Sequence, residues 1–107
     1  MLTTPLDGDL KRVDAELDRL AGAAARWFEG ERIAAADASL TLVVDMRYVG
    51  QNYELPVDVP SGARLPEPQA LARLFFAAHE RSYGHHDPEA PVEIMNLRLT
   101  ATGRLPA

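Results

Sequence analysis

LTLVVDMRYVGQNYELPVDV (Leu40–Val59) is the stretch of sequence that decides the fold. Apolar side chains occupy every second position in residues 40–48 and again in residues 53–59. A period of two places alternate side chains on opposite faces, so each run predicts a half-buried β-strand. Gly50 between the runs can adopt the positive φ of a tight connection, which predicts a β-hairpin. Pro56 has no N–H to donate, so the second strand is expected at a sheet edge.

One amphipathic helix is predicted before this hairpin in the sequence, and a second one after it. Apolar residues of the first recur at steps of three and four: Leu10, Val13, Leu17, Leu20, Ala24, Trp27 and Phe28. Asp7 or Asp9 can cap its start, and Gly30 can end it. The second runs from about Glu67 to Tyr83, ends at Gly84, and is expected to bury Leu71, Leu74, Phe75, Ala78 and Ser82. Both Trp27 and Phe75 are therefore expected in the core.

A last strand is predicted from Val92 to about Thr102, with Met95, Leu97, Leu99 and Ala101 facing the core. The element order is helix, strand, strand, helix, strand. It predicts one α+β domain over residues 1–107, with a small three-stranded, mostly antiparallel sheet and two helices on one face. The second helix can cross over the sheet and place the last strand parallel to one strand of the hairpin.

Composition excludes several classes of function. The net charge of −5 argues against a nucleic-acid-binding protein, which needs a basic surface. The chain has no cysteine, so disulfides, thiolate nucleophiles and cysteine-bound metals are excluded. No apolar run is long enough to span a membrane, and residues 1–9 do not resemble a signal peptide. We therefore expect a cytoplasmic protein without a membrane partner.

Catalytic motifs are not found in the sequence. It contains neither a phosphate-binding loop nor a GxSxG nucleophile. Asp45 and Glu54 are expected to share a sheet face with Arg47 and Arg98, which predicts a cross-strand charge network rather than a pair of catalytic carboxylates. We assign no catalytic residue, and we expect the isolated chain to be inactive.

Three histidines in or near the second helix are candidate metal ligands. His79, His85, His86 and Asp87 are close in sequence, but no two histidines have the spacing that pairs them on one helix face. We expect no tight metal site. His79 and Tyr83 lie four residues apart on one helix face, either as a satisfied structural pair or as the lining of a groove.

The hairpin turn has two interpretations. Tyr48, Gly50, Gln51 and Asn52 form either an ordinary hydrated turn or a docking edge. Gln51 offers two donors and an acceptor, which suits the recognition of a backbone or a cyclic amide. We favour the docking edge, and we expect the Gln51 side chain to be exposed and to contribute little to stability.

Two segments carry a family resemblance. DMRYVGQNYELPVDV (45–59) and LFFAAHERSYGHHDPEAPVEIMNLRLTATGRLP (74–106) resemble segments near the C-terminus of hydantoinase A and 5-oxoprolinase proteins, a family that includes acetone carboxylases. The resemblance covers nearly the whole chain. It implies a domain of a longer enzyme whose actin-like region binds ATP, with a divalent metal, and whose substrates are hydantoins, 5-oxoproline or ketones.

For this chain the resemblance implies a structural C-terminal domain that serves assembly. It implies contacts with the remainder of the parent subunit and with a B-type hydantoinase subunit. The docking residues would be Tyr48, Gly50, Gln51, Asn52, His79 and Tyr83. No cofactor is expected in the chain itself. The alternative is an independent interaction module, or a small-ligand-binding module, that shares only the fold. An actin-like region encoded in frame upstream would favour the first reading.

Overall fold

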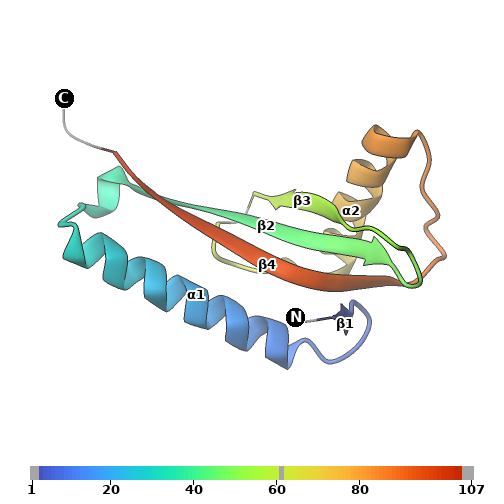
Figure 1. Cartoon of the computed structure of the whole chain (residues 1–107), viewed down its shortest axis with the longest axis horizontal. Coiled ribbons are helices and arrows are strands. Elements are labelled where there is room, and N and C mark those ends of the chain that lie inside the picture. The colour runs from blue at the N-terminus through green and yellow to red at the C-terminus, as the bar shows by residue number, and fades with distance from the viewer. Residues whose placement is uncertain (1–2, 61, 105–107) are drawn as a thin grey trace.

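The computed structural model describes residues 3–60 and 62–104. Within these residues the chain forms a four-stranded antiparallel sheet and two long helices (Figure 1). The elements are β1 (Thr4–Pro5), α1 (Lys11–Gly30), a 3₁₀ turn (Ala35–Asp37), β2 (Ala38–Tyr48), β3 (Leu55–Val59), α2 (Pro68–Tyr83) and β4 (Val92–Gly103). The predicted α+β class is confirmed. No helix in the described part of the chain is long and apolar enough to cross a membrane.

The strand order is β1-β4-β2-β3. The predicted sheet of three strands was incomplete, because β1 pairs with β4 through Thr4 and Pro5. A two-residue strand is too short to show any periodicity, so the sequence gives no signal for it. β3 lies at the sheet edge, as Pro56 predicted. Both β3 and β4 run antiparallel to β2, so they are parallel to each other, and α2 makes the predicted crossover between them.

A β-bulge in β4 changes the predicted facing of its first residues. Asp45 lies opposite Asn96, whereas Met46 lies opposite Ile94, so Met95 is the additional residue. An additional residue shifts the alternation by one position. As a result Ile94 is fully buried and belongs to the core cluster, whereas Met95 is buried outside it. The expectation that Met95 is buried is therefore confirmed, but Met95 does not join the core cluster that contains Leu97.

One apolar core joins both helices to the same face of the sheet. α1 packs along β4 and α2 packs on β3. The centre of the core is fully buried and consists of Val13, Leu42, Val44, Met46, Leu71, Phe75 and Ile94. The Asp9 carboxylate accepts a hydrogen bond from the Lys11 N–H at 2.9 Å at the start of α1. Gly84 adopts a positive φ of 76° where α2 ends.

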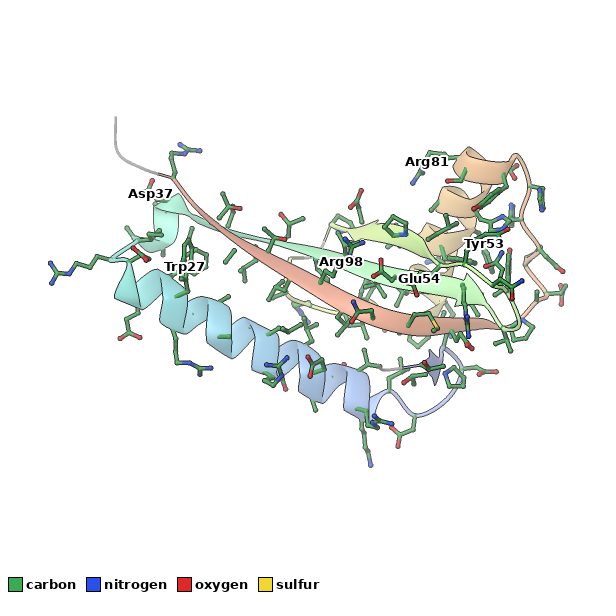
Figure 2. All side chains as sticks on the ribbon, in the orientation of Figure 1. Trp27, Asp37, Tyr53, Glu54, Arg81 and Arg98 are labelled. Atoms are coloured by element: carbon green, nitrogen blue, oxygen red, sulfur yellow. The ribbon has the colours of Figure 1, made fainter. Side chains whose placement is uncertain are left out.

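Helix burial differs from the prediction at three residues. The Trp27 side chain is 44% exposed, and Ser82 is exposed, whereas His79 is only 3% exposed. Trp27 lies near the far end of α1, beside the part of the β2–β4 ribbon that extends beyond β3 and α2 (Figures 1 and 2). β3 pairs with β2 only from Leu42 onward, so the core is not closed around this end of α1.

Candidate functional site at the hairpin turn

The hairpin connection is wider than predicted. β3 begins at Leu55, so residues 49–54 form a loop in which Gly50 has a φ of 91°. The Gln51 N–H donates to the Tyr48 carbonyl at 3.0 Å, which closes the turn. The Arg47 Nη1 donates to the Gln51 carbonyl at 2.9 Å. The turn is therefore fixed by a hydrogen bond within its own backbone and by a second one from the Arg47 side chain in the preceding strand.

The Gln51 side chain points into the molecule. Its Oε1 accepts a hydrogen bond from the Tyr48 N–H at 3.0 Å, and its Nε2 lies 3.3 Å from Nε2 of His79. Both ends of the amide have partners within the chain, and the residue is half-buried. The expectation of an exposed amide with little effect on stability was based on the turn pattern alone. The contacts instead make Gln51 the link between the hairpin and α2.

His79 continues this link to the next loop. Its Nδ1 lies 2.6 Å from the His85 carbonyl oxygen. A carbonyl oxygen only accepts hydrogen bonds, so Nδ1 carries the proton, and Nε2 of the neutral ring is then the acceptor for the Gln51 amide. With both ring nitrogens engaged, His79 is a satisfied buried histidine. The ring centroids of His79 and Tyr83 are 4.9 Å apart, so the two side chains are in contact. These contacts favour the interpretation of His79 and Tyr83 as a satisfied structural pair over the lining of a groove.

Tyr48 anchors the same region from the end of β2. Its hydroxyl accepts a hydrogen bond from the Asp87 N–H at 2.7 Å. Its ring contacts Phe75 and His79 edge-on, each with a centroid separation of 5.0 Å. Tyr48, Gln51 and His79 therefore form one network that connects the hairpin loop, α2 and the α2–β4 loop (residues 84–91).

The exposed part of the site is a pair of tyrosines. Tyr53 and Tyr83 have a ring centroid separation of 5.3 Å, and the two residues are 47% and 44% exposed. Tyr53 lies beside the end of α2 in Figure 2. Desolvation and the neighbouring Tyr53 phenol raise the pKa of Tyr83 above its ordinary value. Val49 and Asn52 are exposed in the same hairpin loop. Neither Tyr53 nor Val49 was among the predicted docking residues. The alternating pattern had placed Tyr53 in a strand.

The three histidines do not gather around one point. No group of three or more His, Cys, Asp or Glu side chains within residues 3–60 and 62–104 has the arrangement of a metal site. The His85 Nδ1 lies 3.1 Å from the Tyr83 carbonyl. The His86 ring stacks on Phe76 with a centroid separation of 5.3 Å.

The polar face of the sheet carries the predicted charge network. Arg98 donates to the Asp45 carboxylate at 2.7 Å, and this hydrogen bond raises the pKa of Arg98. The Arg47 Nε lies 3.5 Å from the Glu93 carboxylate, which is an ionic contact without a hydrogen bond. Glu54 acts on Arg98 only through its longer-range charge. Asp45 and Glu54 are therefore not arranged as an acid–base pair.

The solved structures that share this fold include two ATP-dependent enzymes. The ATP-dependent caprolactamase from Pseudomonas jessenii matches 98% of the chain with a TM-score of 0.82 and 25% identity. A nucleotide-free acetone carboxylase structure also matches 98%, with a TM-score of 0.74 and 19% identity, which shows the fold alone. The family resemblance is confirmed. Both are enzymes of the hydantoinase and 5-oxoprolinase family, and the chain spans 16% of the length of each. No protein-family model and no curated protein matches the sequence.

The two hydantoinase-like motifs meet in the structure. Arg47, Tyr48, Gly50 and Gln51 belong to the first motif, and His79 belongs to the second. The hydrogen bond between Gln51 and His79 joins residues 28 positions apart. Within these two segments, Gln51 and His79 therefore help to hold the hairpin loop on α2, whereas Tyr53 and Tyr83 remain exposed.

Proposed function

We propose that the chain is the C-terminal domain of an ATP-dependent cyclic-amide hydrolase, similar to N-methylhydantoinases and 5-oxoprolinases, and that it serves assembly rather than catalysis. The likeness to the caprolactamase, at a TM-score of 0.82 over 98% of the chain, carries this proposal. The parent would bind ATP and a divalent metal through regions outside this chain, which has no phosphate-binding loop. Such a parent would work in the cytoplasm, where ATP is available.

The shape of the molecule supports a role within a larger protein. The Cα radius of gyration is 15.3 Å, whereas a compact domain of this length has about 13 Å. Trp27, Val49, Tyr53 and Tyr83 are large apolar or aromatic side chains that remain exposed. Tyrosine and tryptophan are enriched among the residues that dominate protein interfaces. Contacts with the remainder of the parent subunit, and with a B-type subunit, would cover these side chains.

We assign different roles to the proposed docking residues. Tyr48, Gln51 and His79 hold the hairpin loop in place through the contacts described above, and Gly50 supplies the positive φ of the turn. Asn52 and Tyr83 are exposed and are proposed to contact the partner directly, together with Tyr53 and Val49. A rigid loop loses little conformational entropy on binding, so the buried network strengthens the contact made by the exposed residues.

The coding sequence around this chain provides the first test. An actin-like ATP-binding region in frame upstream, with a B-type subunit encoded nearby, is expected. An isolated reading frame would favour the independent module instead. In the parent enzyme, removal of this domain should abolish subunit association, whereas a parent that assembles and turns over without the domain would refute the proposal.

Point variants in the parent test the docking edge. Tyr53→Ala and Tyr83→Ala should each weaken association of the subunits at least tenfold, which corresponds to about 1.4 kcal/mol. Thr100→Ala, on the exposed polar face of β4, is the matched control and should leave association unchanged. Wild-type affinity in both tyrosine variants would remove the docking edge from the proposal.

A further inference from the structure

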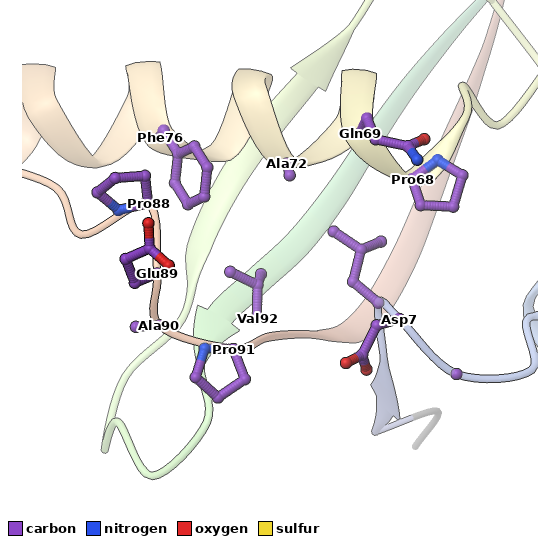
Figure 3. Close-up of a pocket in the computed structure, with 12 residues that line it drawn as sticks. Asp7, Pro68, Gln69, Ala72, Phe76, Pro88, Glu89, Ala90, Pro91 and Val92 are labelled. Carbon is purple, nitrogen blue, oxygen red and sulfur yellow. The ribbon is translucent and has the colours of Figure 1, made fainter.

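A groove of about 680 Å³ lies between the first half of α2 and the α2–β4 loop (Figure 3). Its lining includes the apolar side chains of Leu6, Ala72, Phe76 and Val92. None of its lining residues belongs to the tyrosine pair or to the hairpin loop. Its volume falls in the range of about 300–1,000 Å³ that binding pockets commonly have.

The loop that forms one wall of this groove is fixed at several points. The Asp87 N–H donates to the Tyr48 hydroxyl at 2.7 Å, and the His85 carbonyl accepts from His79 at 2.6 Å. The Val49 N–H donates to the Pro91 carbonyl at 2.9 Å. On the opposite side, the Leu6 N–H donates to Val92 at 2.9 Å. The groove is therefore preformed, and a ligand would pay little to order its walls.

The charges on the groove have one sign. Among the described residues that line the groove, only Asp7 and Glu89 are charged, and both are exposed. Neither carboxylate forms an ion pair with any residue in the described part of the chain. An apolar surface beside two carboxylates attracts a cation attached to an apolar group, and it repels phosphates and acidic segments. The amide of Gln69 adds a neutral hydrogen-bonding group to the rim.

We propose that this groove binds a peptide segment of the parent enzyme that presents an apolar side chain next to a lysine or arginine. The apolar side chain would contact Ala72 and Phe76, and the cation would lie near Glu89 or Asp7. The inference rests on the proposed function, because the parent enzyme supplies the segment. It adds a second contact to the docking edge and gives that contact a stated chemistry.

Short overlapping peptides that cover the parent subunit and its B-type subunit provide the test. Each is titrated into the 107-residue chain by calorimetry. The peptides that bind should combine an apolar side chain with an adjacent Lys or Arg. Glu89→Gln and Asp7→Asn should each weaken binding about two- to fivefold, the range for exposed ion pairs. Glu31→Gln removes an exposed carboxylate outside the groove and should have no effect.

Two further variants block the groove directly. Ala72→Arg should weaken binding at least tenfold where its melting curve matches the wild type. Gln69→Arg places a cation on an exposed rim position, so it keeps the test decisive where Ala72→Arg does not fold. Absence of any binding peptide, or binding that is indifferent to both Glu89→Gln and Gln69→Arg, would overturn the proposal. If the groove binds no such peptide, removal of the domain should still abolish assembly of the parent enzyme. The two experiments therefore distinguish a failure of the groove proposal from a failure of the proposed function.

Discussion

Replacement of Gln51 by alanine tests the buried network directly. The wild-type amide accepts a hydrogen bond from the Tyr48 N–H at 3.0 Å and lies 3.3 Å from the His79 ring nitrogen. Alanine removes both contacts. The Tyr48 N–H and Nε2 of His79 then lose their hydrogen-bond partner, and His79 is only 3% exposed. A typical hydrogen bond contributes about 0.5–1.5 kcal/mol net, so the loss of two should cost about 1–3 kcal/mol.

Urea denaturation measures this loss. With an m-value of about 1 kcal/mol/M for a chain of this size, the midpoint should fall by about 1–3 M, with the slope unchanged. The coupling between Gln51→Ala and His79→Ala, measured in a double-mutant cycle, should be about 0.5 kcal/mol or more, since the two residues are in contact.

Asn52→Ala is the matched control for this experiment. Asn52 is exposed in the same loop, so its replacement should change stability by less than about 0.5 kcal/mol. A wild-type midpoint in Gln51→Ala, or additive effects in the cycle, would refute the network and return Gln51 to the status of a hydrated turn residue.

Further predictions concern the core, the tyrosine pair and catalysis. Phe75→Ala should cost about 3–5 kcal/mol because Phe75 is fully buried, whereas Trp27→Ala should cost about 1 kcal/mol; equal costs, measured in urea, would contradict the burial. Absorbance titration should show Tyr53→Phe lowering the raised pKa of Tyr83. A raised folded-state pKa gives stability that is present below pH about 10 and is lost as pH rises through the folded pKa, so an unchanged alkaline melting curve in that variant would contradict the linkage. The purified chain should turn over neither ATP nor cyclic amides; turnover abolished by a mutation within the chain would disprove this.

Secondary structure was largely predictable because it depends on local periodicity. The alternation around Gly50 located the hairpin, and Pro56 identified the edge strand. The features that were missed depend on contacts between distant segments. β1 exists only because Thr4 and Pro5 meet β4, and the bulge at Met95 is visible only in the pairing with β2.

The candidate site was predictable in its residues but not in their roles. Sequence reasoning selected Gln51, His79 and Tyr83, and the structure brings all three into one region. It could not tell which side chains face inward, because Gln51 and His79 find each other across 28 positions of sequence. Tyr53 was missed for the same reason, since it lies before the start of β3 and its neighbour Tyr83 is 30 positions away in the sequence.

Trp27 was predicted to lie in the core but is exposed, and the composition of α1 around it suggests a physical reason. Residues 20–28 of α1 contain a single charged side chain, that of Arg26. A helical segment that is apolar on nearly every side is normally buried, yet in this stretch only Ala24 falls in the buried class. This sequence pattern is typical of a helix that is packed on most sides, whereas residues 3–60 and 62–104 bury only one side of it. Under the proposed function, the remainder of the parent enzyme supplies the other side. Trp27→Ala should then cost clearly more stability in the parent than in the isolated chain, and equal costs in both would leave the exposed end of α1 without a partner.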